Sequence, residues 1–295
     1  MEAFHSFWSE PNRCRNRGKI RFPDYEQLTA ILSALQWQKH NGRIRMITDS
    51  AGEQFLNESG LICFWDETVV ALDFLKEKVD PFAFWAAGKL YALKMTPAPC
   101  VMLDTDLIVW KNIENMLQSD VVAAHSEVLN PQIYPDPSVF QLKNGYHFPR
   151  IWDFKLYAAN TAFLYIKNAA FRNCYVDASM EFMQNVITDR VNPVHTMCFA
   201  EQRILPMCAK AEGEKLQFLM QGNDVYRQDY VTHTWGFKRI LMENQKAREE
   251  FCMRCVRRIA LAHPDKLKLL ENCPDIRKYY LTFMNYSSVI PEASE

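Results

Sequence analysis

The feature that most constrains the fold is the alternation of short apolar runs with segments of helical periodicity. Strands are predicted at 3–8, 44–48, 67–72 and 100–103, and helices at 24–41 and 81–95. Short strands that alternate with helices through short connections predict an α/β fold with a mostly parallel sheet covered by helices. In such sheets ligands bind beyond the carboxyl ends of the strands. Polar side chains that follow a predicted strand are therefore the first candidates for a site.

The helix predicted at 24–41 has a clear start signal, and Asn41-Gly42 is its predicted stop. Asp24 would cap it and Gln27 would reach back, which is a capping-box pattern directly after Pro23. One apolar stripe follows, formed by Leu28, Ile31, Leu32 and Leu35. The basic, glycine-containing stretch 13–21 before this helix predicts a loop.

Two acids follow the most apolar predicted strand. The run 100–103 is continuously apolar, as a fully buried strand is, and leads into Asp104-Thr105-Asp106. Two neighbouring carboxylates repel and raise each other's pKa, and a divalent cation removes that repulsion. Mg²⁺ and Mn²⁺ bind through one or two carboxylates and complete their shell with water and substrate phosphates. On spacing alone, solvated turn residues are an equal alternative, but the apolar run 107–110 on the other side favours metal binding.

Residues 84–93 and 99–106 together resemble the helix, the strand and the Asp-x-Asp motif of GT-A glycosyltransferases. The resemblance is nearest to the retaining glycogenin-like and bacterial galactosyltransferase families, and it follows the order of elements over residues 1–240. It implies a Rossmann-like GT-A fold, a UDP-sugar donor and Mn²⁺ or Mg²⁺. It also implies that Asp106 is a direct metal ligand and that Asp104 contacts ribose and metal. Lys89 would face the diphosphate or brace the acids, unless it is a surface lysine.

The nucleotide-base pocket of those families is formed by the first strand and by the end of the second. The matching positions in this chain are Ser6, Trp8 and Asp49. For Trp8, the alternative to a place in this pocket is an ordinary position in the hydrophobic core.

Two further segments resemble the sugar-binding part of the family. Residues 157–164 are similar to its Asn-x-Gly segment, which points to Asn160, although Ala162 replaces the usual glycine. Residues 200–205 resemble its acid-Gln segment at the start of a helix, which points to Glu201. Glu201 would act as a base in an inverting enzyme or orient the sugar in a retaining one. Its alternative is an acid that stabilises a helix N-terminus.

The segment 232–238 resembles a late His-x-x-Gly-x-x-Lys motif of the glycogenin-like families. The resemblance implies that His233 is the third metal ligand and that Gly236 and Lys238 contact phosphate. Lys238 comes one residue early, so Arg239 is an alternative phosphate contact.

Residues 1–240 are expected to form the catalytic domain and 241–295 a helical C-terminal extension packed on the core. The stretch 126–150 is rich in proline and aromatic residues and predicts an insertion over the cleft, either an acceptor-binding lid or simple packing. In the extension, a helix with three clustered arginines either packs on the core or also contacts anionic lipid at a membrane surface. These arginines are Arg254, Arg257 and Arg258.

Composition indicates which partners and which cellular location to expect. A net charge of -1 gives no global reason to expect a nucleic-acid partner. Nine cysteines are scattered through apolar stretches, which is typical of reduced thiols in a cytoplasmic protein. The N-terminus has no basic leader, and no apolar run approaches the roughly 20 residues of a membrane span. We therefore expect a cytoplasmic protein, with peripheral membrane contact as an option.

Together these features predict a metal-dependent hexosyltransferase. It would transfer a hexose from a UDP-sugar to a hydroxyl of a glycan, lipid-linked or protein acceptor in glycan or polysaccharide synthesis. Two alternatives stay open. A haloacid-dehalogenase-like phosphatase also has Asp-x-Asp after a buried strand, but it needs Thr or Val where this chain has Ile108. A non-catalytic nucleotide or carbohydrate binder of the same fold would tolerate the altered segment around Asn160.

Overall fold

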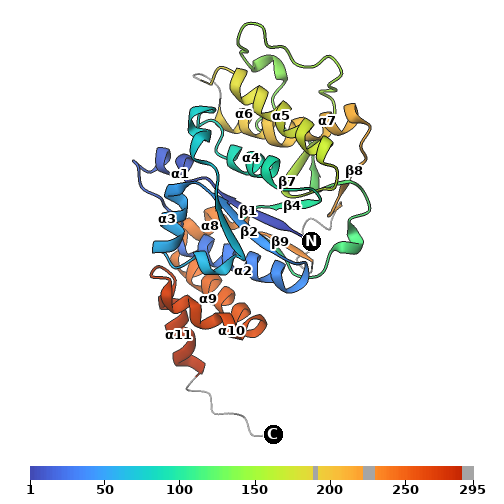
Figure 1. Cartoon of the computed structure of the whole chain (residues 1–295). Helices are drawn as coiled ribbons and strands as arrows, with labels where there is room; N and C mark the ends of the chain where they lie inside the picture. Colours follow the sequence, from blue (N-terminus) through green and yellow to red (C-terminus); the bar gives the residue numbers. More distant parts are fainter. Residues whose placement is uncertain (189–191, 222–229, 288–295) are drawn as a thin grey trace.

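The computed structural model describes residues 1–188, 192–221 and 230–287. Its centre is a seven-stranded sheet in the order β3-β2-β1-β4-β7-β6-β8 (Figure 1). The strands are β1 Ala3–Phe7, β2 Ile44–Thr48, β3 Glu67–Val70, β4 Cys100–Leu103, β6 Val121–Glu127, β7 Ala158–Ile166 and β8 Leu216–Phe218. Pairing is parallel throughout except along β7, which is antiparallel to both of its neighbours. The predicted α/β fold with a mostly parallel central sheet is therefore confirmed.

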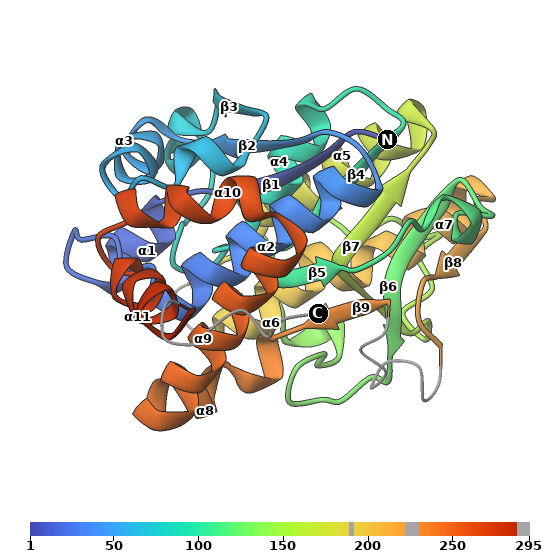
Figure 2. The same cartoon turned by 90° about the horizontal axis from the view of Figure 1, so that it is seen from below.

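The sheet has helices on both faces. Helices α4 (Ala87–Met95), α5 (Ala169–Asn185), α6 (Pro193–Cys198) and α7 (Ile204–Glu212) cover one face (Figure 1). Helix α2 (Asp24–His40) covers the other, with α9 (Gln245–Ala262), α10 (Pro264–Leu267) and α11 (Arg277–Ser287) on the side of α2 away from the sheet (Figures 1 and 2). Successive residues of a strand point to opposite faces, so each central strand contributes to two cores. In β4, Val101 and Leu103 join the core beneath α2, whereas Cys100 and Met102 join the core beneath α4 and α5.

The strand predictions agree closely with the structure, and the helices differ from the prediction in three places. Residues 13–21 are not all loop, because α1 (Glu10–Arg15) extends into them as far as Arg15. This helix has a proline in its first turn. The segment 81–86 forms turns, so the helix predicted at 81–95 begins only at Ala87. Helix α3 (Ser50–Glu58), which is short and buries only Gly52 and Leu56, was not predicted.

The capping box proposed for α2 is absent. Asp24 is the first residue of the helix and makes no side-chain cap, because its carboxylate binds Arg248 and Tyr279 instead. Gln27 donates to the backbone oxygen of Phe22 and to Asp275. Both side chains are therefore used for tertiary contacts, which local spacing cannot reveal.

The C-terminal helices pack on α2 mainly through α9, and Tyr279 of α11 also contacts Asp24. The apolar side of α9 is buried there and consists of Cys252, Cys255, Val256 and Ile259. The three clustered arginines are exposed, and two of them lie over rings of the protein itself: Arg254 over Phe251 and Arg258 over Trp110. Residues 288–295 of the predicted extension lie outside the described residues. Within the described residues, no helix combines the length and the apolar character needed to cross a membrane.

Candidate metal and nucleotide site

The two acids lie where β4 ends, at the carboxyl edge of the sheet. The backbone turns there, because the amide of Leu107 donates to the carbonyl oxygen of Asp104 over 3.1 Å. The amide of Asp104 donates to Ala162 on β7 over 2.8 Å. These bonds fix the backbone of the turn, so the two carboxylates project from a rigid support.

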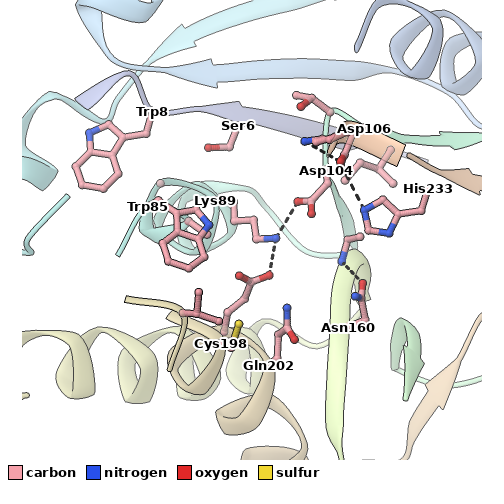
Figure 3. A pocket seen from close by; sticks show the side chains of 18 of the residues that line it. Ser6, Trp8, Trp85, Lys89, Asp104, Asp106, Asn160, Cys198, Gln202 and His233 are labelled. Carbon is pink, nitrogen blue, oxygen red and sulfur yellow. Dashed lines mark hydrogen bonds and ion pairs between the residues drawn. The ribbon is translucent and has the colours of Figure 1, made fainter. Parts of the chain in front are cut away.

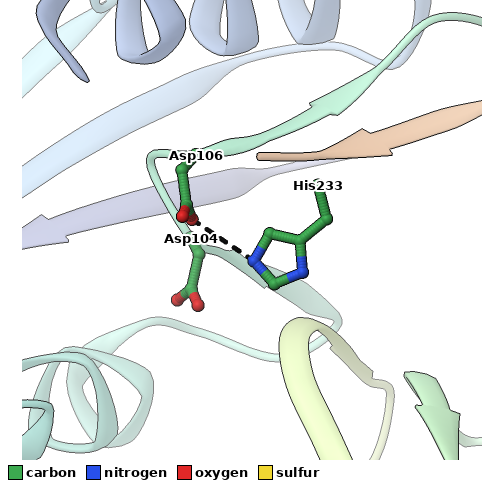
Figure 4. A group of neighbouring side chains, drawn as sticks. All are labelled: Asp104, Asp106 and His233. Atoms are coloured by element: carbon green, nitrogen blue, oxygen red, sulfur yellow. Dashed lines mark ion pairs between the residues drawn. The ribbon is translucent and has the colours of Figure 1, made fainter. Parts of the chain in front are cut away.

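A second, two-stranded sheet brings in the histidine. Strand β5 (Leu107–Val109) pairs antiparallel with β9 (Val231–His233), and Leu107 lies opposite His233. The amide of Thr234 donates to the carbonyl oxygen of Asp106 over 3.0 Å. As a result His233 Nε2 lies 3.5 Å from Asp106 Oδ1 (Figure 4). Asp104, Asp106 and His233 each offer a ligand atom, and these atoms all lie within 4.8 Å of one another.

Two lysines neutralise the acids. Lys89 Nζ on α4 lies 2.8 Å from Asp104 Oδ1 and 2.5 Å from Glu201 Oε1; Figure 3 shows Lys89 and Asp104 pointing toward each other. Lys238 Nζ, at the start of α8 (Lys238–Glu243), lies 2.9 Å from Asp106 Oδ2. Lys89 is therefore not a surface lysine.

Burial and charge act in opposite directions on these groups. Burial alone would lower the pKa of Lys89, but Asp104 and Glu201 outweigh it and raise that pKa. Burial alone would raise the pKa of Asp106, but His233 and Lys238 outweigh it and hold that pKa well below its usual range. The site therefore contains charged lysines and an ionised Asp106 at neutral pH.

Glu201 lies in a π-helical turn, Phe199–Arg203, between α6 and α7. It is thus inside a continuous helical run, and its predicted place at the start of a helix is wrong. The wider turn leaves carbonyl groups without their usual helical partners. The hydroxyl of Tyr175 donates to the carbonyl oxygen of Glu201 over 2.6 Å, and that of Ser179 donates to Ala200 over 2.8 Å.

The Glu201 carboxylate is buried and held by two donors, Lys89 and the hydroxyl of Thr161. Burial raises its pKa, Asp104 raises it further, and Lys89 and Thr161 oppose the rise. The net result is a carboxyl group that accepts a proton more readily than an exposed glutamate.

These groups line one cavity of about 490 Å³, a size typical of small-ligand sites (Figure 3). Nine of the residues singled out from the sequence are in its wall: Ser6, Trp8, Lys89, Asp104, Asp106, Asn160, Glu201, His233 and Lys238. The fold therefore gathers residues from both ends of the chain into one place.

Two of the predicted site residues do not line this cavity. The carboxylate of Asp49 caps α3 by accepting from the amide of Gly52, and it also accepts from the amide and hydroxyl of Ser9. It is buried and its oxygens are already engaged, so its predicted place in a nucleotide-base pocket is corrected to a structural one. Gly236 lies exposed in the turn Trp235–Phe237 before α8, outside the cavity wall.

Lys238 and Arg239, the two alternative phosphate contacts, lie differently at the start of α8. Lys238 faces the cavity, whereas Arg239 is exposed and pairs with Glu243 one turn further on at 3.2 Å. Arg239 is therefore a neighbouring cation outside the site.

Several lining residues were not identified from the sequence. Asn160 donates to Glu127 Oε1 over 2.7 Å, and the hydroxyl of Tyr134 contacts both Glu127 and Gln202. Trp85 adds an aromatic wall. Tyr134 lies in the proline- and aromatic-rich stretch 126–150. The sequence could not single it out there, because the other aromatic residues of that stretch fit the same pattern.

The other aromatic side chains of the stretch 126–150 lie in the hydrophobic core, away from the cavity. Phe140, Tyr146 and Phe148 pack in the core beneath α5 and around Phe182 and Phe199. The packing alternative therefore describes most of the aromatic residues, and Tyr134 is the one that lines the cavity.

Gly88 is another lining residue with a specific role. A Cβ atom at this position would lie 2.5 Å from Trp8 Cβ and 3.3 Å from the hydroxyl of Ser6. Glycine therefore permits α4 to approach β1 closely, which sets the width of the cavity beside Trp8.

The acid–acid–histidine cluster has the donor types that a divalent cation needs. Ligands on opposite sides of Mg²⁺ or Mn²⁺ lie about 4.2 Å apart, given bonds of about 2.1 Å. Ligand atoms within 4.8 Å of one another can reach that spacing by small side-chain movements. Asp104, Asp106 and His233 therefore fit a divalent ion.

The chain is an α/β protein with an acid–acid–histidine cluster at the carboxyl edge of a mostly parallel sheet. The chain belongs to DUF6734, a family of unknown function, whose model matches residues 1–272. Among curated protein sequences, none matches this chain.

Solved structures with a similar fold include several glycosyltransferases. Mouse xyloside xylosyltransferase 1 in its apo form has 11% identity and a TM-score of 0.40, over 75% of this chain and 85% of that one. The PaToxG glycosyltransferase has 13% identity and a TM-score of 0.40, over 96% and 86%. The galactosyltransferase LgtC, in complex with donor and acceptor sugar analogues, has 10% identity and a TM-score of 0.35, over 74% and 73%. These likenesses are remote.

Proposed function

We propose that this protein is a metal-dependent glycosyltransferase that transfers a hexose from a UDP-sugar to a hydroxyl acceptor in glycan or polysaccharide synthesis. One observation carries the proposal: Asp104, Asp106 and His233 converge at the mouth of a buried strand, inside a cavity that two lysines also line. A binding site with this balance of charges suits a divalent cation together with a diphosphate.

Asp104, Asp106 and His233 would hold the ion, which neutralises the charge that develops on a departing nucleoside diphosphate. The imidazole nitrogen makes Mn²⁺ a better fit than Mg²⁺, which prefers oxygen ligands. Lys238 supplies a second positive charge beside Asp106. Ser6 and Trp8, on and just after β1, form the wall proposed for the nucleotide.

The sugar would lie between the acids and the π-helical turn. Glu201 and Asn160 line that side of the cavity, and Lys89 joins Glu201 to Asp104. Glu201 would accept the proton of the incoming hydroxyl in an inverting reaction, for which its raised pKa is suited. In a retaining reaction, Glu201 and Asn160 would orient the sugar.

Other predictions stand as proposals beside this one. They are a catalytic domain at 1–240 with an insertion at 126–150 over the cleft, a helical extension at 241–295, a cytoplasmic location, and a glycan, lipid-linked or protein acceptor. Contact of the basic helix with a membrane surface is proposed only as an addition to its packing on α2.

The test combines binding with turnover. Thermal unfolding is measured with UDP, UMP and ADP, each with and without Mn²⁺, and release of UDP is followed with a panel of UDP-sugars. We expect UDP with Mn²⁺ to raise the unfolding temperature most, and one UDP-sugar to be consumed. Asp106→Asn should abolish the stabilisation by UDP with Mn²⁺ and lower turnover by about 10²–10³-fold. Asp120→Asn, which changes a half-exposed acid paired with Lys167, is the matched control and should retain both.

Each alternative has its own outcome in the same assays. Release of inorganic phosphate from a phosphomonoester, without UDP binding, would favour the phosphatase. Stabilisation by UDP and Mn²⁺ without turnover of any donor would favour the non-catalytic binder.

A further inference from the structure

Each acid of the cluster shares its lysine with a second carboxylate outside the cluster. Lys89 lies between Asp104 and Glu201. Lys238 lies between Asp106 and Glu26 on α2, with its Nζ 2.9 Å from Asp106 Oδ2 and 3.3 Å from Glu26 Oε1. The second arrangement is the informative one, because Glu26 has no part in the site described above.

Lys238 and a metal ion would compete for the same carboxylate. The Asp106 side chain is only a tenth exposed, and a cation bound to it would repel the ammonium group held 2.9 Å from its other oxygen. Charges this close interact strongly wherever burial limits screening by water. Binding of the ion therefore requires that Lys238 move away from Asp106.

Glu26 provides the alternative position for that ammonium group. It is already within ion-pair distance of Lys238, and its side chain is about a quarter exposed. Arg239, the next residue, is turned away toward Glu243 and cannot substitute. A short movement of the Lys238 Nζ toward Glu26 would leave Asp106 to the ion without creating an unpaired ammonium group.

We propose that Lys238 is a built-in competitor of the metal ion at Asp106, and that Glu26 is the positioning residue that receives Lys238 when the ion binds. This inference rests on the metal site of the proposed function and extends it to a residue of α2. Lys238 lines the cavity in the position that the structure shows, beside Asp106.

The inference predicts effects of opposite sign for two variants. Lys238→Met removes the competitor, so Mn²⁺ should bind roughly tenfold more tightly in the absence of nucleotide. Glu26→Gln removes the alternative partner and leaves Lys238 on Asp106, so Mn²⁺ should bind several-fold more weakly. If Glu26 acts only through Lys238, the double variant should bind Mn²⁺ as Lys238→Met does.

The measurement is a titration of the full chain with Mn²⁺ alone, in which free Mn²⁺ is followed by electron paramagnetic resonance. Arg239→Met is the matched control, because it removes the neighbouring exposed cation, and it should bind Mn²⁺ as the wild type does. Thermal unfolding of every variant verifies the fold, and Lys238→Gln is measured as a second removal of the charge.

The inference is overturned if the wild type binds Mn²⁺ and Lys238→Met and Lys238→Gln bind it no more tightly, or if the double variant is as weak as Glu26→Gln. Either result leaves the proposed function standing. A wild type that binds no Mn²⁺ would instead remove the metal site itself, and the proposed function with it.

Discussion

Two buried aspartates, Asp24 at the start of α2 and Asp106 beside β5, have similar surroundings and different purposes. Both side chains are nearly inaccessible, with residue exposures of 5% and 7%. Asp24 binds Arg248 at 2.6 Å and accepts from the hydroxyl of Tyr279 at 2.7 Å. Asp106 binds Lys238 at 2.9 Å. Each is a carboxylate whose burial is offset by a cation.

The difference lies in what surrounds each pair. The oxygens of Asp24 are occupied by donors from α9 and α11 and by the amide of Tyr25. Asp106 faces a cavity and has a second acid and a histidine as neighbours. A buried acid that the protein itself satisfies joins elements of the fold, whereas one that lies beside a second acid in a cavity suits a ligand.

The largest change in folding stability is expected in the region around Asp24. Asp24→Asn removes the partner of Arg248 and should lower the free energy of unfolding by about 3 kcal/mol, the low end for a broken buried pair, because Arg248 is partly exposed. Chemical denaturation measures this loss. Mn²⁺ affinity should stay at the wild-type value, and a parallel loss of metal binding would show that the two regions are not independent.

Asp106→Asn is the matching change in the second region. Turnover of a UDP-sugar should fall by about 10²–10³-fold, as when a group that stabilises developing charge is lost. Its loss of stability should be smaller than that of Asp24→Asn, because Lys238 keeps Glu26 as a partner. Steady-state kinetics and denaturation of the two variants test the contrast, and equal losses of stability would refute it.

Two glycines allow a steric version of the same contrast. Gly60 has φ +69° and faces the carbonyl oxygen of Asn272, whereas Gly88 faces Trp8 in the cavity wall. An alanine at either position would overpack by about 1–3 kcal/mol. Gly60→Ala should lower the unfolding temperature and leave the affinity for UDP with Mn²⁺ unchanged. Gly88→Ala should weaken that affinity, which calorimetric titration would measure, because Trp8 and α4 must separate.

The smallest expected effect is on the dependence of stability on pH. Burial would raise the pKa of Asp24, but Arg248 and Tyr279 outweigh it and the pKa is lowered. The stabilisation by ionised Asp24 is therefore fully present above the unfolded pKa of about 3.9 and is lost as the pH falls through the folded value. Denaturation between about pH 5 and pH 2 should show the gap between wild type and Asp24→Asn closing as the pH falls; a constant gap would contradict the assignment.

Much of the fold could be predicted because its signals are local. A continuous apolar run such as 100–103 can only be a buried element, and its length and flanking prolines favour a strand. Asp104 and Asp106 follow it directly, so their place at the edge of the sheet needed no knowledge of the rest of the chain. The start of the helix predicted at 81–95 was wrong because its apolar spacing continues through residues that form turns.

The side-chain partners could not be predicted, because they depend on elements far apart in the chain. Asp24 looked like a helix cap, yet α9 and α11 bring it Arg248 and Tyr279. Glu127 gave no signal at all, because its neighbour Asn160 is brought to it by pairing of β6 with β7.

The alternation of strands and helices, and the place of two acids at the end of a buried strand, follow from the sequence alone, since periodicity and chain direction are properties of neighbouring residues. The tertiary structure brings His233 to those acids, because the pairing of β5 with β9 sets the distance between them. It also decided that Lys238 is shared between Asp106 and Glu26, and that Asp49 is used as a cap. The packing of whole helices and strands decides which charged side chains meet, and no local pattern of residues encodes that packing.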